Sequence, residues 1–233
     1  MLTALLKKNL SPDHVSQLRQ WYQGVHSFTL PAIPGVHALL YGLHRTLSAT
    51  GQALLQKLYY TPLFLSRVAN RPRRLQLYSG MPLLCGQLRI ELGEGCRISG
   101  ATTFSGRNSS ERPTLVIGDN VDINWQSTIA VGEQVILEDN VRLAGRVFLA
   151  GYPGHPVDPL RRARGEPDDA HQVGSIHLKE NVWVGTGSTI LQGVTIGENS
   201  IVATGSVVTK SMPANVLIGG NPARVIKPLE VQP

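Results

Sequence analysis

A histidine within a charged, proline-rich interruption of an otherwise regular sequence is the first residue with an evident chemical capacity. The interruption reads GHPVDPLRRARGEPDD over residues 154–169, and its histidine is His155. Imidazole has an unperturbed pKa of ~6.5, so it can accept a proton from an attacking hydroxyl without being permanently charged. Pro156 restricts His155 to extended backbone angles, and Asp158 followed by Pro159 favours a turn. His155 is therefore a candidate general base.

The segments that must position this histidine repeat every six residues. The most regular run of aliphatic side chains is Leu178, Val184, Ile190, Ile196, Val202 and Val208. Small side chains follow four residues after members of that run: Val182, Ser188, Val194, Ser200 and Ser206. One large inward side chain and one small corner residue per unit describe a flat face, and three faces close one coil of 18 residues. An α-helix would need a period of ~3.6 residues. The pattern therefore predicts a parallel β-helix.

Earlier segments have the same period. Large apolar residues recur every six positions in three further runs: Leu92, Ile98 and Phe104, then Ile117, Ile123 and Ile129, then Leu137, Leu143 and Leu149. Residues 151–174 break this pattern, which predicts a loop expelled between two coils. Because the walls of a β-helix are smooth, such a loop is suited to placing reactive side chains in a groove.

The first third of the chain has a helical pattern. Ser11 followed by Pro12 is typical of a helix start, and Val36, Leu39 and Leu43 follow one helix face. A third helix is expected over residues 51–60, before Pro62. We therefore divide the chain into a basic helical region, residues 1–78, and a β-helix domain, residues 79–233, which includes the loop 151–174.

The positive charge of the chain is concentrated in the helical region. Residues 1–78 hold nine Lys and Arg against one acid, Asp13, whereas the whole chain has a net charge of +6. The remaining residues are therefore slightly acidic. Two interpretations stay open: a helical cap whose basic residues are only solvated, or a surface that contacts anionic lipid, where each basic residue contributes ~1 kcal/mol.

Composition limits the compartment and the partners. Cys85 and Cys96 are the two cysteines, too few for a disulfide framework, which favours a reducing, cytoplasmic setting. The N-terminus lacks the pattern of a signal peptide, and no stretch approaches the ~20 apolar residues of a membrane span. We expect a soluble or peripheral protein in the cytoplasm, in contact with the inner membrane if the basic region binds lipid. We expect no nucleic-acid partner.

The hexapeptide pattern resembles that of the left-handed parallel β-helix acyltransferases, over roughly residues 88–228. The loop GHPVDPLRRARGEP and the later segment NVWVGTGSTILQGVTIGENSIVATGSVVTKSMPANVLIGGNPARVIK are similar to the maltose and galactoside O-acetyltransferase branch. That branch has a His-Pro-x-Asp-Pro loop, then Asn-Val-Trp-x-Gly and a closing Gly-x-Pro-x-Arg-Val-Ile. The resemblance implies a mainly β fold, a left-handed parallel β-helix, here preceded by an α-helical region.

The same resemblance implies an activity. His155 would deprotonate an acceptor hydroxyl, which attacks the thioester of acetyl-CoA and releases the CoA thiol, with no covalent acyl-enzyme and no metal. It also implies a homotrimer with active sites between neighbouring subunits.

Further site residues follow from the resemblance, each with a structural alternative. The acceptor site would include Asn124, Asp158 and Trp183. Asn124 could instead be a corner residue of the β-helix. The tryptophan that corresponds to Trp183 in the resembling enzymes is near the donor groove, and the alternative for Trp183 is a large side chain at a subunit contact. Thr186 would lie near the pantetheine arm of CoA. The nucleotide end would be lined by Thr204, Thr209, Lys210, Arg224 and Lys227, of which Lys210 could be only a solvated charge. We expect Arg161, Arg162 and Arg164 to form salt bridges with Glu166, Asp168 and Asp169 in the loop; the alternative is that they bind an anionic acceptor.

The resemblance fails in the helical region and just before His155, where GYPGHP is one residue longer. We therefore expect a sugar held on a lipid or polymer, as in a surface polysaccharide, a lipopolysaccharide or a lipid-linked glycan. Three alternatives remain: an N-acetyltransferase that acts on an amino-sugar nucleotide, a zinc enzyme like the γ-class carbonic anhydrases that uses His155, His171 and His177, and a binding scaffold without chemistry.

Overall fold

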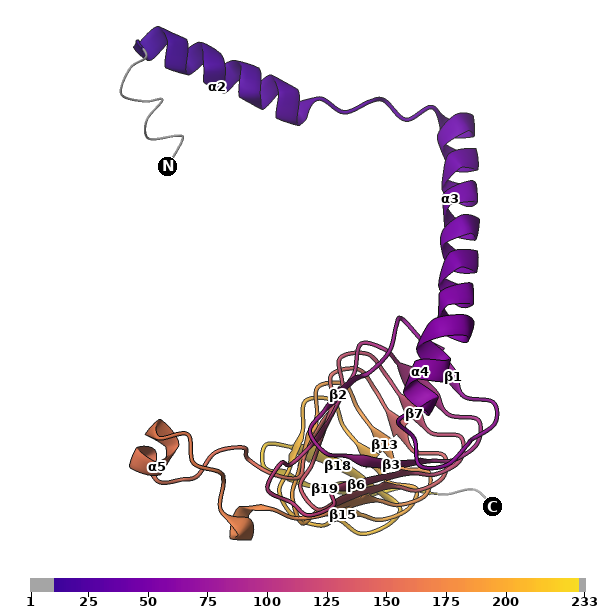
Figure 1. The fold of residues 1–233 in the computed structure, drawn as a ribbon, viewed down its shortest axis with the longest axis vertical. Coiled ribbons are helices and arrows are strands. Elements are labelled where there is room, and N and C mark those ends of the chain that lie inside the picture. Colours follow the sequence, from indigo (N-terminus) through magenta and orange to yellow (C-terminus); the bar gives the residue numbers. More distant parts are fainter. Residues whose placement is uncertain (1–10, 231–233) are drawn as a thin grey trace. The chain divides into compact units, whose positions relative to one another are not determined.

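The helices of the N-terminal region carry almost no buried surface. A computed structural model describes residues 11–230 (Figure 1). Helix α2 spans Pro12–Ser27, and the Ser11 hydroxyl accepts a hydrogen bond from the His14 amide, as expected for an N-cap. Helix α3 spans Pro34–Leu55, and neither helix has a buried residue. Within residues 11–230, none of the helices combines the length and apolar character needed to cross a membrane.

The expected third helix is not a separate element. Helix α3 continues through Gly51 into a π-helical turn, Gln56–Tyr60, and then into α4, Thr61–Leu65. Pro62 lies in the first turn of α4, where its missing N–H leaves no hydrogen bond unmade. The wider π turn lets the helix pass the proline, so the expectation of a break before Pro62 was wrong.

Three sheets form the walls of the coil, and all their strands pair in parallel except β19, which is antiparallel to β18 (Figure 1). The eight-stranded sheet contains, in order, β1 (Gln76–Tyr78), β4 (Arg97–Ser99), β7 (Asp122–Ile123), β10 (Arg142–Leu143), β13 (Trp183–Val184), β16 (Ile201–Val202), β18 (Val216–Gly220) and β19 (Ala223–Pro228). The six-stranded sheet contains β17 (Val207–Val208), β14 (Thr189–Leu191), β11 (Phe148–Ala150), β8 (Thr128–Val131), β5 (Thr103–Gly106) and β2 (Leu83–Cys85). The five-stranded sheet contains β15 (Thr195–Ile196), β12 (Ile176–Leu178), β9 (Gln134–Leu137), β6 (Thr114–Ile117) and β3 (Arg89–Leu92).

The six-residue spacing places one residue on each wall. Leu178 pairs with Ile196 on one sheet and Val184 with Val202 on the next, so one coil takes 18 residues. All the aliphatic side chains of the repeat lie in one continuous core. The small corner residues are buried too, and the Ser188 hydroxyl donates to the Ala203 carbonyl oxygen at 2.9 Å. The predicted β-helix preceded by a helical region is confirmed.

The coil begins earlier in the chain than the boundary we placed after residue 78. Strand β1 already pairs with β4, and Phe64 of α4 is fully buried, with its ring 6.5 Å from that of Phe104 between centroids. Within residues 11–230, the boundary between the two units of the chain accordingly falls between Ala49 and Thr50. The apolar side chains of α4 and β1 belong to the β-helix core, which explains this difference.

We expect the core to respond strongly to truncation in the central coils. Leu143 is fully buried in β10, so Leu143→Ala removes apolar contacts and leaves a cavity, at a cost of about 2–5 kcal/mol. Leu160 in the loop is 69% exposed, and Leu160→Ala should change stability by less than ~0.5 kcal/mol. Denaturant unfolding of both variants checks the contrast. Equal effects would contradict the assignment of Leu143 to the core.

Candidate active site

The predicted loop leaves the coil at one corner and returns to it there. It starts after β11 and rejoins before β12, and the Gly174 amide donates to the Gly151 carbonyl oxygen at 3.0 Å. The two ends of the loop are therefore joined to each other. Figure 1 shows the loop, with helix α5 (Pro159–Ala163), standing out from the wall. A cavity of about 480 Å³ lies between the loop and the coil, and its lining includes Ser105, Arg107, Asn108, Tyr152, His155 and Glu166.

A buried ion pair fixes this loop to the coil. Arg107, which follows β5, donates from Nε to Asp168 Oδ1 at 2.7 Å and from Nη2 to the Asp168 carbonyl oxygen at 3.0 Å. The side chains of Arg107 and Asp168 are 11% and 4% exposed. The second carboxylate oxygen of Asp168 accepts from the Gly154 amide at 3.2 Å, directly before His155. Arg107 and Asp168 together therefore set the backbone that carries the histidine.

The arginines of the loop are held by the acids of the loop. Arg161 pairs with Glu166 at 2.8 Å and with Asp169 at 2.6 Å, and Arg164 pairs with Glu166 at 2.8 Å. Hydrogen bonds from Arg161 and then Arg164 lower the pKa of Glu166. The expectation of a salt-bridged loop is confirmed for these two arginines, whereas Arg162 donates to the carbonyl oxygens of residues 156 and 157.

The cavity therefore offers mainly neutral polar groups around His155. The charges of Arg107 and Glu166 are already paired, and the Ser105 and Tyr152 hydroxyls share a hydrogen bond of 2.8 Å. His155 is exposed at the cavity, and within residues 11–230 no side chain is hydrogen-bonded to its imidazole. The ring is thus free to meet a hydroxyl group.

Asp158 has a local role in the structure. Its carboxylate caps helix α5 by accepting from the Arg161 amide at 2.9 Å and the Leu160 amide at 2.8 Å. These hydrogen bonds, that of Arg161 first, lower its pKa, so the cap is present at neutral pH and is lost only in strong acid. Contact with an acceptor stays a prediction for this residue.

A second group of the predicted residues lies at another corner, where the chain leaves the eight-stranded sheet. Trp125, Gly145, Thr186 and Thr204 occupy equivalent positions on successive coils: the Trp125 carbonyl oxygen accepts from the Arg146 amide, that of Gly145 from the Gly187 amide and that of Thr186 from the Gly205 amide. We call these four residues the corner column.

Asn124 precedes the corner column and is held at both ends of its amide. Its oxygen accepts from the Tyr78 hydroxyl at 3.1 Å, and its nitrogen donates to the Leu143 carbonyl oxygen at 3.0 Å. Burial, and then the charge of Asp122, raise the pKa of Tyr78. The hydroxyl is therefore protonated at neutral pH and can keep Asn124 in place.

Trp125 is a site candidate that sequence reasoning missed. It is 45% exposed, and a Cβ atom built on Gly145 would lie 2.9 Å from its Nε1. The Arg146 guanidinium lies 5.0 Å from its ring centroid, a cation–π distance. Gly145 therefore leaves space in the corner column that the indole partly covers. The signal in the sequence was a tryptophan directly after Asn124.

The remaining predicted residues line neither the cavity nor the corner column. Trp183, 50% exposed, lies on the outer face of the eight-stranded sheet in β13. Arg224 and Lys227 lie on β19, the antiparallel strand at the edge of that sheet, and both are exposed. Thr209 and Lys210 follow β17, at the end of the six-stranded sheet from which the His155 loop also leaves.

One chain therefore brings only part of the predicted site together. The His155 loop lies at one end of the six-stranded sheet, whereas Asn124 and the corner column lie at the other end. Nor do the described residues group three His, Cys, Asp or Glu side chains where they could hold a metal ion. The zinc alternative thus lacks a set of ligands within residues 11–230, and His177 is paired with Glu138 at 2.5 Å.

Comparison with known proteins supports the sequence resemblance. The family profile “Bacterial transferase hexapeptide (six repeats)” matches residues 175–210. The galactoside O-acetyltransferase of Escherichia coli (strain K12) is 41% identical over 111 residues, which cover 48% of this chain and 52% of the relative. That of Lactococcus lactis subsp. lactis (strain IL1403) is 34% identical over 137 residues, 58% of this chain and 61% of the relative. The match thus spans little more than half the length of these relatives.

Solved structures share the fold. An N-acyltransferase from Bacillus cereus aligns with a TM-score of 0.59 at 20% identity, over 73% of this chain and 89% of its own. A hexapeptide-repeat acetyltransferase from Vibrio cholerae aligns with a TM-score of 0.51 at 22% identity, over 86% of this chain and 96% of its own. The resemblance to the hexapeptide-repeat acyltransferases is therefore confirmed, at the level of sequence over half of the chain and of fold over most of it.

Proposed function

We propose that this chain, whose coil of hexapeptide repeats is shared with bacterial transferases, is an acetyl-CoA-dependent O-acetyltransferase that acts on a sugar hydroxyl. The observation that carries the proposal is His155, held at a polar cavity by a loop that Arg107 and Asp168 anchor. The sequence similarity to galactoside O-acetyltransferases supports the same reaction class.

In the proposed reaction, His155 takes the proton of the acceptor hydroxyl. The oxygen then attacks the thioester carbonyl of acetyl-CoA, the carbon–sulfur bond breaks, and the CoA thiolate receives a proton from the imidazolium. Proton transfer to a placed imidazole makes the hydroxyl a stronger nucleophile in the step that limits an uncatalysed reaction. Cys96 is buried in the core, and although Cys85 lines the cavity, direct attack by the hydroxyl oxygen on the thioester needs no acyl-enzyme.

The cavity favours an uncharged acceptor group at the reacting centre. Arg107 and Asp168 of its lining pair with each other, and Glu166 pairs with arginines of the loop, so an incoming ligand meets the Ser105 and Tyr152 hydroxyls and the Asn108 amide. A sugar ring presents hydroxyl groups that can both donate to and accept from such a lining. The acceptor would be a glycan of a surface polysaccharide, a lipopolysaccharide or a lipid carrier.

A homotrimer would complete the site. Asn124, Thr186 and Thr204 lie at the far end of the six-stranded sheet from His155, whereas Thr209 and Lys210 lie at the same end as His155. In a trimer, the loop of one subunit would reach the corner column of the next and so bring the donor and the base together. The imidazole, which no described side chain of its own chain holds, would then be oriented by the second subunit.

The helical region would hold the enzyme at the inner membrane from its cytoplasmic side. Helices α2 and α3 expose aromatic and aliphatic side chains, among them Trp21, Tyr22, Leu39 and Leu43, and belong to the region 1–78, whose sequence has an excess of basic residues. Aromatic and aliphatic groups together with Lys and Arg favour anionic lipid surfaces.

Calorimetric titration with CoA, together with zinc analysis of the same sample, tests the proposal. Binding without stoichiometric zinc supports the donor site, and a screen of acceptors then follows the release of the CoA thiol. Turnover with a hydroxyl acceptor supports the proposal. Turnover only with amino sugars would instead favour the N-acyltransferase alternative, whose fold this chain shares. Zinc without CoA binding would overturn the transferase.

The donor site gives a quantitative prediction. Because Arg224 is exposed on β19 and a guanidinium pairs with phosphate oxygens, Arg224→Ala should weaken CoA binding about tenfold, most clearly at low salt. Arg45→Ala, which removes an exposed arginine of α3, serves as the control and should leave CoA affinity unchanged. If the two variants bind CoA with equal affinity, Arg224 is not part of the donor site.

A further inference from the structure

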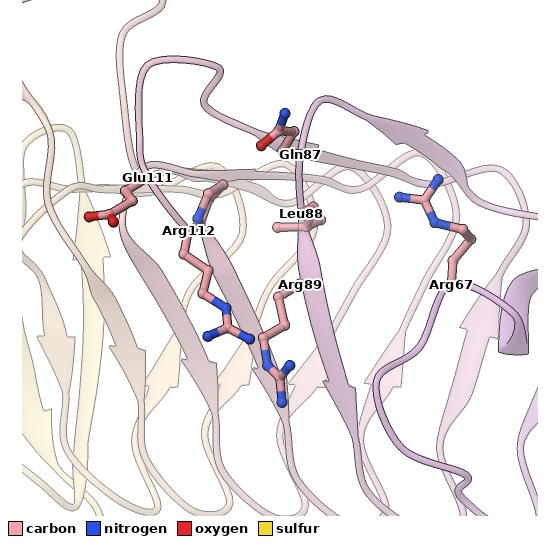
Figure 2. Close-up of a pocket in the computed structure, with 7 residues that line it drawn as sticks. Arg67, Gln87, Leu88, Arg89, Glu111 and Arg112 are labelled. Carbon is pink, nitrogen blue, oxygen red and sulfur yellow. The ribbon is translucent and has the colours of Figure 1, made fainter.

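Three arginines from separate segments line one pocket at the first coils of the β-helix. The pocket, of about 310 Å³, is lined by Arg67, which follows α4, by residues 87–89 at the start of β3, and by residues 111–113 before β6. Figure 2 shows the Arg89 and Arg112 side chains extending in the same direction along the sheet, with Arg67 on the other side of β3. We call this the arginine pocket.

The positive charge of the arginine pocket is only partly balanced. Arg89 pairs with Glu91 at 2.7 Å. Within residues 11–230, neither Arg67 nor Arg112 has an acidic partner within salt-bridge distance. Glu111 also lines the pocket, but its carboxylate lies on the side away from Arg89 and Arg67 in Figure 2. Like-charged side chains gathered around a hollow favour an anion between them.

The arginine pocket adjoins the cavity of His155. Cys85 and Gly86 line the cavity, and the next residues, 87–89, line the arginine pocket. In the same way, residues 105–109 line the cavity and residues 111–113 the arginine pocket. The two hollows thus lie on either side of one corner, made by the same two stretches of chain. The three residues from Gly86 to Arg89 span at most ~10 Å, comparable to one or two sugar units.

We propose that the arginine pocket binds a phosphate group. Guanidinium groups pair with phosphate oxygens in a bidentate manner, and the dianion matches several cations better than a single carboxylate does. Resting on the proposed function, the proposal adds to it that the phosphate belongs to the acceptor, close to the sugar that His155 deprotonates. A lipid headgroup carries the same chemistry, and the experiment separates these two sources.

Titration of the full chain with inorganic pyrophosphate, without and with saturating CoA, tests the site. Pyrophosphate bound in the donor groove would be displaced by CoA, whereas that in the arginine pocket would not. We expect CoA-insensitive binding that the double variant R89Q/R112Q weakens at least ~10-fold. The matched control, R19Q/R45Q, makes the same change in net charge at exposed arginines of α2 and α3 and should bind like the parent chain.

Vesicle flotation then identifies the source of the phosphate. The probes are phosphatidylcholine vesicles with and without phosphatidylglycerol. If the phosphate belongs to the acceptor, R89Q/R112Q floats like the parent chain; if it is a lipid headgroup, R89Q/R112Q loses flotation. Equal pyrophosphate binding by R89Q/R112Q and the parent, or none in the presence of CoA, overturns the proposal. If the chain binds no CoA but still binds pyrophosphate through Arg89 and Arg112, the proposed transferase function is refuted while the phosphate site in the arginine pocket is supported.

Discussion

Replacement of His155 by alanine is expected to lower the rate of acetyl transfer about 10²–10⁴-fold, the usual contribution of a placed general base. The loss should fall on the turnover number, because an exposed imidazole at the cavity acts on the acceptor proton and does not hold the nucleotide of CoA. The affinity for CoA, measured by calorimetry, should stay within about twofold. Release of the CoA thiol, followed with the acceptor found by screening, measures the rate.

His171 provides the matched control for this experiment. It is an exposed histidine in the 3-10 helix Ala170–Gln172 of the same loop. His171→Ala should keep close to full activity, since it lines no part of the cavity. If His155→Ala keeps more than a tenth of the parent rate, His155 is not the general base. If His155→Ala instead loses affinity for CoA, His155 contributes to binding of the donor.

Asp168→Ala should release the loop that carries His155. The substitution leaves the Arg107 guanidinium buried without its partner, and breaking a buried pair in this way costs about 3–5 kcal/mol. It also removes the acceptor of the Gly154 amide, so the backbone next to His155 loses its support. We expect rapid trypsin cleavage after Arg161, Arg162 or Arg164 in the native coil, together with a turnover number at least ~10-fold lower and an unchanged CoA affinity.

The pair of Arg107 with Asp168 can be separated from a general loss of stability. Arg107→Ala should have a similar effect, and the double variant should lose less than the sum of the two single variants, because the pair is then removed as a unit. Glu91→Ala breaks an exposed ion pair instead and should cost less than ~1 kcal/mol without opening the loop. Full protection of the loop arginines in Asp168→Ala would show that other contacts hold the loop.

The regular part of the fold could be predicted because its information is local. The residue types in each six-residue unit indicate which side chain points inward and where the corner lies. The spacing of Leu178, Val184 and Ile190 therefore predicts three walls and the register of the next coil. The salt bridges of Arg161 and Arg164 also follow from neighbours in sequence. In the helical region, Gly51 and Pro62 led to the wrong prediction of a separate third helix. The structure accommodates Gly51 within α3 and Pro62 in the first turn of α4.

The anchoring contacts of the site could not be predicted in the same way. Arg107 and Asp168 are 61 positions apart, and their pairing depends on how a loop of this length folds back over two coils. The corner column depends on which corner each residue reaches after the irregular spacings between coils. The arginine pocket likewise combines Arg67, Arg89 and Arg112, which come from three separate segments. No local sequence pattern predicts that these three residues lie close together.

The way the loop closes on itself at Gly151 and Gly174 bears on where the molecule first opens. In a stack of coils, each coil is stabilised only by its two neighbours, so thermal opening starts at the ends and moves inward. The loop emerges from β11, with β14 and β17 on one side and β8, β5 and β2 on the other, and the Arg107 pair ties it across two coils. Fraying of the first or last coil therefore leaves the His155 segment intact. The loop segment that carries the base is therefore anchored away from the least stable parts of the solenoid.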